Sequence, residues 1–186
     1  MRRTVLLLAG LWAGCGELPP EPSAESQVAQ EAFEDWLDAL IRGDAPAAWA
    51  GLSEGNRSHW IFERLRDGDS AAHDWRKAWS GETRTQLDLW YFYHRDRNDE
   101  RVRVLPTEVL AHPSTVALWT RYFKESLPEV RRQMQKLEIT QVYADGAMVT
   151  VLARNLVGKI EMYQLRFEAG GWKVDHHREA VRQVPR

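Results

Sequence analysis

Residues 137–153 read LEITQVYADGAMVTVLA, and this stretch decides the fold predicted for the chain. Polar and apolar side chains alternate on both sides of Asp145-Gly146, a dipeptide that accepts the positive φ angles of a tight hairpin turn. Two more alternating runs follow, at residues 160–167 and 172–176, with turn residues between them. We therefore predict four sequential antiparallel strands in this part of the chain.

The segments before this meander carry helical patterns. From the candidate cap Ser26 to Gly43, apolar side chains recur every three or four residues. Asp44 followed by Pro46 marks the start of a second helix, because proline lacks the amide hydrogen that a first helical turn leaves unbonded. Further apolar stripes predict helices over residues 58–67 and 70–80, after Ser114, and from a new start at Ser126.

Residues 86–94 fit two patterns. Read as a strand, the segment alternates and forms a hairpin with residues 102–105; read as a helix, it runs through Leu87 to His94. We take the strand as the first interpretation and keep the helix as the alternative. The predicted class is then α+β, with N-terminal helices packed on a curved antiparallel sheet of about six strands, in a single domain over residues 26–186.

The first residues predict where the protein resides. Arg2 and Arg3 precede an apolar run that is too short to span a bilayer, which takes about 20 residues. The stretch Leu11-Trp12-Ala13-Gly14-Cys15 resembles the lipobox of bacterial lipoproteins, although Trp12 stands where leucine is usual. The resemblance implies a signal peptide over residues 1–14, lipidation of Cys15 and a flexible linker to residue 25. An ordinary secretory signal is the alternative.

A lipobox implies an exported protein that is attached to the cell envelope. Its partner would be the membrane itself, reached through the acyl chains on Cys15. Gly16, rather than aspartate, follows the cysteine, which favours the outer membrane of a two-membrane bacterium, with the domain facing the periplasm.

Composition narrows the function classes. Removal of residues 1–14 leaves 23 basic and 27 acidic side chains, a net charge of about −4, so nucleic-acid binding is not expected. A single cysteine excludes an intrachain disulfide. Adjacent His176 and His177 face opposite sides of a strand, and the chain carries no phosphate-binding loop. We expect neither a metal site nor a cofactor.

Three stretches resemble the nuclear-transport-factor-2-like superfamily: residues 33–52 with Gly43-Asp44, residues 145–151, and the closing Gly170-Gly171-Trp172-Lys173-Val174. The resemblance implies a cone enclosed by helices and sheet. Isomerase-like and cyclase-like members use the cone for substrates, and others use it for binding or assembly. The sheet often forms a homodimer in that superfamily, and the residues here neither indicate nor exclude one.

Candidate site residues follow from that implied cone. Asp88 and His94 are the candidate acid or base, since they alternate with the aromatic side chains of Trp90 and Phe92; the alternative places them at the rim of a partly solvated sheet. Trp90, Phe92 and Trp60 are the candidate ligand-stacking residues, whereas the other tryptophans follow core stripes. Glu161 is a weaker candidate and is expected at the surface.

Three functions remain open at this point. The first is an envelope lipoprotein whose non-catalytic domain binds a small apolar ligand or a protein. The second is an isomerase-like or cyclase-like enzyme with a pocket carboxylate as general base. The third is a structural accessory of an envelope assembly. The first two differ in whether a carboxylate and a hydrogen-bond donor converge inside one apolar cavity.

Overall fold

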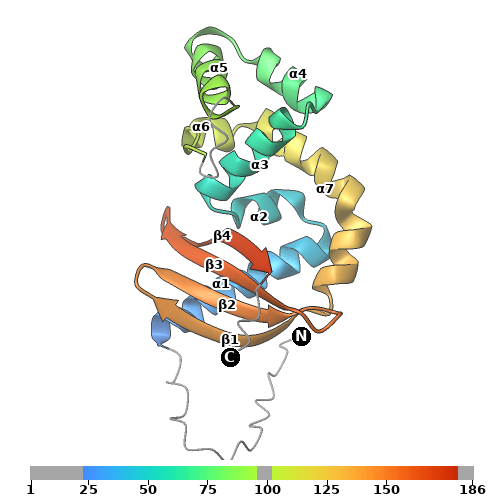
Figure 1. The fold of residues 1–186 in the computed structure, drawn as a ribbon, viewed down its shortest axis with the longest axis vertical. Helices are drawn as coiled ribbons and strands as arrows, with labels where there is room; N and C mark the ends of the chain where they lie inside the picture. Colours follow the sequence, from blue (N-terminus) through green and yellow to red (C-terminus); the bar gives the residue numbers. More distant parts are fainter. Residues whose placement is uncertain (1–22, 96–101, 180–186) are drawn as a thin grey trace, which may run out of the picture.

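The computed structural model describes residues 23–95 and 102–179, without the side chains of Asp145 and residues 176–179. Within these ranges, helices precede strands along the chain, as Figure 1 shows. The helices are α1 (Ala24–Arg42), α2 (Ala45–Ala50), α3 (Glu54–Arg66), α4 (Ser70–Ala78), α5 (Gly81–Arg95), α6 (Thr107–Leu110) and α7 (Pro113–Met134). The strands are β1 (Glu138–Asp145), β2 (Met148–Arg154), β3 (Ile160–Glu168) and β4 (Gly171–Glu179). The predicted α+β class is confirmed, whereas residues 1–14 and Cys15 lie outside the described residues.

The four predicted strands form one antiparallel sheet in the order β1-β2-β3-β4. Asp145 pairs with Met148 around Gly146, whose φ of 61° is the positive angle that a tight turn requires. Bulges shift the register at Thr140, between Ile139 and Gln141 of β1, and at Asp175 of β4, opposite Gln164 and Leu165 of β3. The predicted meander is confirmed, and it supplies four of the six expected strands in the described residues.

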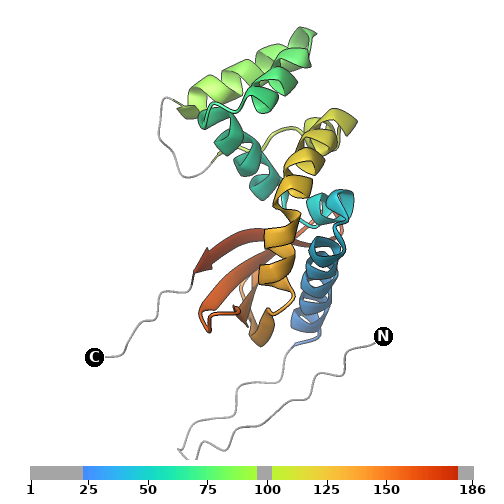
Figure 2. The ribbon, with the colours of Figure 1, turned by 90° about the vertical axis from the view of Figure 1, so that its right-hand side faces the viewer.

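One face of the sheet packs against α1, and α7 packs against α1 on the same side of the sheet (Figure 2). Val149 and Val151 of β2, with Tyr163 and Leu165 of β3, are buried on this face. The ring of Phe33 from α1 lies 4.9 Å from the ring of Tyr163. The periodic face that the sequence predicted for the first helix therefore forms the core with the sheet.

Side-chain caps set the starts of the first two helices. Asp44 caps α2 as predicted, since its Oδ1 accepts a hydrogen bond of 3.1 Å from the backbone N–H of Ala47. For α1, the predicted cap Ser26 is wrong by three residues: Ser23 is the cap and accepts a hydrogen bond from the Ser26 N–H. Ser26 itself is buried in the first turn.

Helices α3 to α6 extend away from the sheet, and α7 runs back from them to the start of β1 (Figure 1). Two indole side chains join this helical part to α2. Trp49 of α2 donates from Nε1 to the carbonyl oxygen of Leu110, and Trp119 of α7 donates to the carbonyl oxygen of Ala45. The molecule is therefore elongated, with the sheet at one end and α4 and α5 at the other.

The hairpin expected over residues 86–105 is wrong, and the alternative helix is correct. Residues 86–94 lie within α5, and residues 102–106 carry no strand. The buried residues of α5 are Leu87, Tyr91 and His94, at helical spacing, so the same aromatic-rich segment also satisfies a 3.6-residue period. Side-chain pairs at i, i+4 add support for the helix, namely Glu82 with Gln86 and Arg84 with Asp88.

The new helix start expected at Ser126 is also wrong. Helix α7 continues from Pro113 to Met134 through Pro128. The Ser126 hydroxyl bonds backward to the carbonyl oxygen of Tyr122 at 3.0 Å rather than capping a following turn. Burial of Phe123, with Leu127 packed beside it, holds the helix together across the proline.

Candidate functional site

Asp88, Trp90, Phe92 and His94, four of the predicted acid–base and ligand-stacking residues, lie on one helix at the end of the molecule away from the sheet. This helix is α5, whereas Trp60 belongs to α3. Because α5 is a helix, Asp88 and Phe92 share one face, whereas Trp90 and His94 share another. The strand alternation that grouped them does not exist, so the structure divides them between two faces.

Asp88 is held between two guanidinium groups. Its Oδ2 accepts a hydrogen bond of 2.7 Å from Arg84 Nε, and its Oδ1 lies 3.5 Å from Arg76 Nε. The Arg76 side chain is 10% exposed, so it carries a positive charge into the interface between α4 and α5. Burying such a charge is costly without a partner, and Asp88 supplies that partner. The geometry is that of a structural ion pair.

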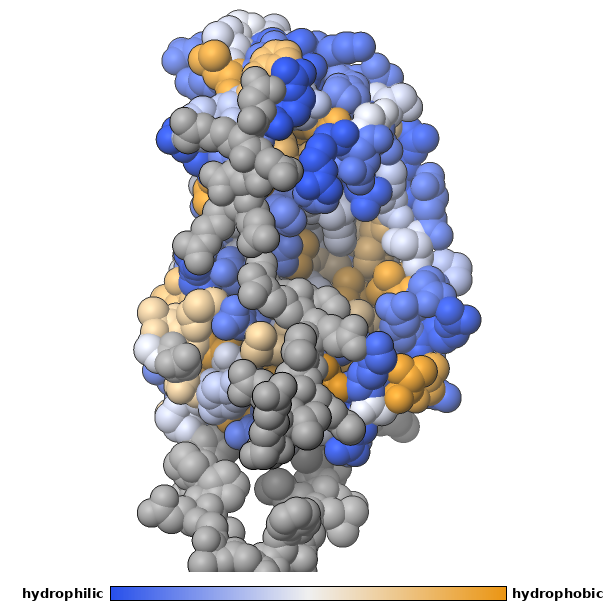
Figure 3. Space-filling view, in the orientation of Figure 1, coloured by the Kyte–Doolittle hydropathy of each residue, from blue (hydrophilic) through white to orange (hydrophobic). Residues whose placement is uncertain are grey.

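Phe92 lies at the surface beside this ion pair. Its ring is 43% exposed, and the guanidinium carbons of Arg76 and Arg95 lie 5.5 Å and 4.8 Å from its centroid. Leu89, one turn away, is 67% exposed. Figure 3 shows hydrophobic surface at the upper end of the molecule, where α5 lies. We call Leu89, Phe92 and the adjoining Arg76, Arg84 and Asp88 the α5 surface.

His94 and Trp90 hold the segment that follows α5 on its other side. His94 is 1% exposed, and its Nε2 accepts a hydrogen bond of 3.0 Å from the backbone N–H of Arg103. Trp90 donates from Nε1 to the carbonyl oxygen of the same residue at 2.7 Å. Accepting at Nε2 implies that a neutral His94 ring carries its proton on Nδ1. Both side chains therefore hold the backbone of Arg103, just before α6.

Trp60 belongs to a cluster of aromatic rings between α2, α3 and α7. Its ring lies 5.8 Å from Trp49, 5.1 Å from Trp119 and 5.6 Å from Tyr122, in edge-to-face arrangements. The Arg64 guanidinium carbon lies 5.3 Å from the Tyr122 ring. Burial, together with the hydrogen bond to the Asp69 carboxylate and its charge, raises the pKa of Tyr122 to about 12. Trp60 is therefore packed against other rings.

Glu161, which the sequence predicts at the surface, is partly buried. It faces the helices beside Tyr163, whose hydroxyl donates a hydrogen bond of 2.6 Å to Glu161 Oε2. Asn155 donates from Nδ2 to Glu161 Oε1 at 2.7 Å. Burial, and then the hydrogen bond and charge of Glu161, raise the pKa of Tyr163. An acid and a donor do meet here, but both carboxylate oxygens already accept hydrogen bonds within the fold.

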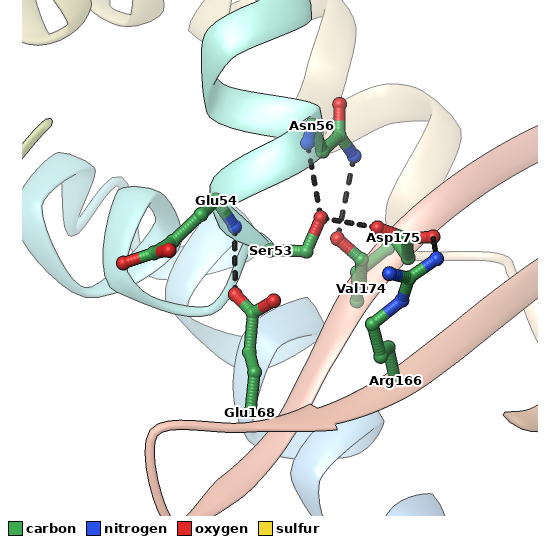
Figure 4. Close-up of polar contacts among 7 residues, drawn as sticks. All are labelled: Ser53, Glu54, Asn56, Arg166, Glu168, Val174 and Asp175. Atoms are coloured by element: carbon green, nitrogen blue, oxygen red, sulfur yellow. Dashed lines mark hydrogen bonds and ion pairs between the residues drawn. The ribbon is translucent and has the colours of Figure 1, made fainter. Parts of the chain in front are cut away.

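A polar junction joins the start of α3 to the sheet (Figure 4). Ser53 Oγ accepts a hydrogen bond of 3.0 Å from the Asn56 N–H and donates one of 2.6 Å to Asp175 Oδ1. Glu168 Oε1 accepts from the Glu54 N–H at 2.6 Å. Two carboxylates of the sheet thus contact the positive end of a helix, where negative charge is stabilised. The remaining contacts are Asn56 with the Val174 carbonyl oxygen and Arg166 with Asp175.

No sequence signal could have found this junction. Ser53 and Asp175 are 122 residues apart, and Glu54 and Glu168 are 114 apart. Ser53 reads as a helix cap from the sequence, but the identity of its second partner depends on the way β4 lies beside residues 51–53. The Glu161 pair did leave a signal, because Glu161, Tyr163 and Leu165 alternate on one strand face.

Two cavities lie among the described residues, and neither brings the predicted site residues together. A cavity of about 50 Å³ between α5 and residues 105–109 is lined partly by Trp90 and Leu87, and it is far smaller than the 300 Å³ or more typical of ligand sites. A wide, open depression lies along the outer face of α7, near Ala117 and Thr120. Asp88, His94, Phe92 and Trp60 line neither of them.

Comparison with protein-family models, with curated proteins and with solved structures finds no match to this chain. Within residues 23–95 and 102–179, no group of three potential ligand side chains is placed to hold a metal ion. In the same ranges, no helix has the length and apolar character needed to cross a bilayer.

Proposed function

We propose that the protein is a lipid-anchored envelope lipoprotein whose domain binds a partner protein without catalysing a reaction. The observation that carries this proposal is the α5 surface. It presents two large apolar side chains, one of them stacked on the largely buried Arg76, at one end of an elongated molecule, and α1 begins at the other end (Figure 1). We further propose that the helices and sheet form a variant of the nuclear-transport-factor-2-like cone.

The chemistry of the α5 surface supports a protein partner. Phenylalanine and arginine are enriched at the centres of protein interfaces, where a flat ring and a delocalised cation give much contact area. Phe92 and Arg76 already lie against each other, so little side-chain freedom remains to be lost on binding. Leu89 extends the apolar area beside them.

The position of the α5 surface supports a tethered role. Cys15 lies eight residues before Ser23, a length that spans at most about 28 Å when fully extended. A lipid on Cys15 would therefore keep the start of α1 close to the bilayer. The α5 surface at the far end would then face away from the membrane, towards a partner in the periplasm.

Site-specific photo-crosslinking in cells tests the binding role. A photoreactive phenylalanine analogue is placed at Leu89, and as a control at Ala117 on the exposed outer face of α7. We expect one discrete adduct from position 89, none from 117, and loss of the adduct when Phe92→Ser is added. Identical adducts from both positions, or an adduct that survives Phe92→Ser, would contradict binding through the α5 surface.

Metabolic labelling tests the anchor separately. With an alkyne-bearing fatty acid in the medium, the wild-type chain should become labelled and sediment with membranes. Cys15→Ser should lose both the label and the processed form. A Cys15→Ser protein that is processed normally and stays with the membrane would rule out lipidation at this residue.

A further inference from the structure

The turn between β2 and β3 carries two large aliphatic side chains at its tip. Leu156 is 49% exposed and Val157 is 73% exposed. Neither belongs to the buried core clusters of the described residues. The other two turns of the sheet are built instead from Asp145-Gly146 and from Ala169-Gly170, so large apolar tips are not needed for this meander.

The shape of the turn does not depend on these two side chains. Asn155 Oδ1 accepts hydrogen bonds from the backbone N–H groups of Val157 at 3.1 Å and Lys159 at 3.0 Å. The Gly158 N–H donates to the carbonyl oxygen of Asn155, and Gly158 has a φ of 80°. Asn155 and Gly158 thus define the turn. Leu156 and Val157 are held on a rigid support with their side chains towards solvent.

The turn lies at the end of the molecule where α1 begins. Both are near the lower end of the described chain, opposite α4 and α5, with α1 beginning at the left and the β2–β3 turn at the right of Figure 1. Figure 3 shows strongly hydrophobic surface at the lower right, where β2 turns into β3. A linker of eight residues from Cys15 to Ser23 reaches about 28 Å at most, so a lipid on Cys15 would bring this end to the bilayer.

Basic side chains lie beside the apolar tip. Lys159 directly follows the turn and is exposed. Lys136, also exposed, lies just before β1, whose first residue Glu138 pairs with Arg154 at the base of the turn. Lysines beside apolar residues suit the level of lipid head groups, where the ammonium contacts phosphate and the stem contacts acyl chains.

We propose that Leu156 and Val157 insert into the interface of an anionic phospholipid bilayer, with Lys136 and Lys159 at the level of the head groups. This inference rests on the proposed lipid anchor, because two side chains give too little apolar area for stable binding alone. The anchor makes insertion an intramolecular step with a high effective concentration. The turn would then fix the orientation of the domain on the membrane.

A fluorescent probe in the turn tests this inference on the lipidated full-length chain. Because acylation consumes the thiol of Cys15, an introduced Val157→Cys carries the single reactive thiol. It is labelled with an environment-sensitive dye, and the protein is reconstituted in vesicles of phosphatidylethanolamine and phosphatidylglycerol, with or without brominated acyl chains. Ala147→Cys in the exposed β1–β2 turn and Thr85→Cys on α5 are the matched controls.

We expect the dye at position 157 to emit at shorter wavelength and to be quenched by brominated lipid, while both controls remain unquenched. Adding Leu156→Asp should reduce the inserted population about three- to tenfold, since burying the exposed half of the leucine side chain is worth about 0.7–1.4 kcal/mol. Insertion would be overturned if the dye at position 157 emitted at the same wavelength as the dye at position 147. It would also be overturned if the emission at position 157 shifted to shorter wavelength but brominated lipid did not quench it. Dye attachment to wild-type Cys15 would instead show that the anchor itself is absent.

Discussion

Replacing Ser53 by alanine removes two interactions at the start of α3. The hydroxyl caps the helix by accepting from the Asn56 N–H, and it donates to Asp175 across the junction with the sheet. Ser53 is fully buried, so water cannot take over either contact. The substitution keeps the backbone and removes only one oxygen atom.

The expected loss follows from these two contacts. A lost serine cap costs about 1 kcal/mol. A lost hydrogen bond to a charged group costs about 1.5–3 kcal/mol, and the lower end applies here because Asp175 keeps Arg166 as a partner. The free energy of unfolding should therefore fall by about 2.5 kcal/mol, which lowers the Tm by about 5–10 °C in a domain of this size.

Urea unfolding, followed by tryptophan fluorescence, measures this loss. Ser23→Ala is the matched control, because Ser23 caps α1 through the Ser26 N–H without a carboxylate from another element. It should cost about 1 kcal/mol or less. In a double-mutant cycle, Ser53→Ala and Asp175→Ala should couple by about 1.5 kcal/mol. Equal losses for Ser53→Ala and Ser23→Ala would refute the reasoning, because the bond to Asp175 would then contribute nothing.

Three further perturbations test other parts of the fold. In Gly51→Ala the new Cβ would lie 2.5 Å from Cδ1 of Trp36, so we expect a loss of about 1–3 kcal/mol in urea unfolding; no loss would mean that the indole moves freely. Asp88→Asn leaves Arg76 without its counter-charge and should cost about 1–3 kcal/mol, whereas a gain in stability would contradict the structural ion pair. Because burial and the charge of Glu161 raise the pKa of Tyr163, its stabilising contribution is complete below pH ~10 and is lost as the pH rises further. Unfolding free energies measured from pH 8 to 12 should fall above pH ~10, and Tyr163→Phe should weaken that fall.

The sheet could be predicted because its information is local. Each turn of the meander is signalled by adjacent residues, and each strand by alternation over a few positions. The same holds for α2, where Asp44 and Pro46 mark the start within three residues. The sequence predicts Ser26 as the cap of α1 because it stands just before the apolar stripe, but Ser23, the actual cap, lies only three residues earlier. A sequence pattern therefore predicts that a helix exists more accurately than it predicts the residue at which the helix begins.

Residues 86–94 show where local information fails. Aromatic side chains favour strands, and alternation in this segment is good, yet Leu87, Tyr91 and His94 also recur at helical spacing. Whether the segment forms a strand or a helix depends on which of the two sets of side chains packs against another element. The helical set packs against α3, where the ring of Phe62 lies 5.9 Å from His94. That contact spans 32 residues in sequence. The predicted grouping of Asp88 with His94 is wrong for the same reason. The two side chains would share a face of a strand, but they point to different faces of a helix.

The polar junction matters for the proposed function because it sets the distance between the two ends of the molecule. Helix α7 has 22 residues and rises about 33 Å, from the helical part down to the start of β1. A partner on the α5 surface would then be held roughly this far above the end that we propose contacts the bilayer. Besides α7 and the hydrogen bond from Trp49 to Leu110, Ser53 and Glu168 add a direct connection between α3 and the sheet, which limits tilting of the upper part. A weakened junction should therefore reduce crosslinking at Leu89 while leaving quenching at position 157 unchanged.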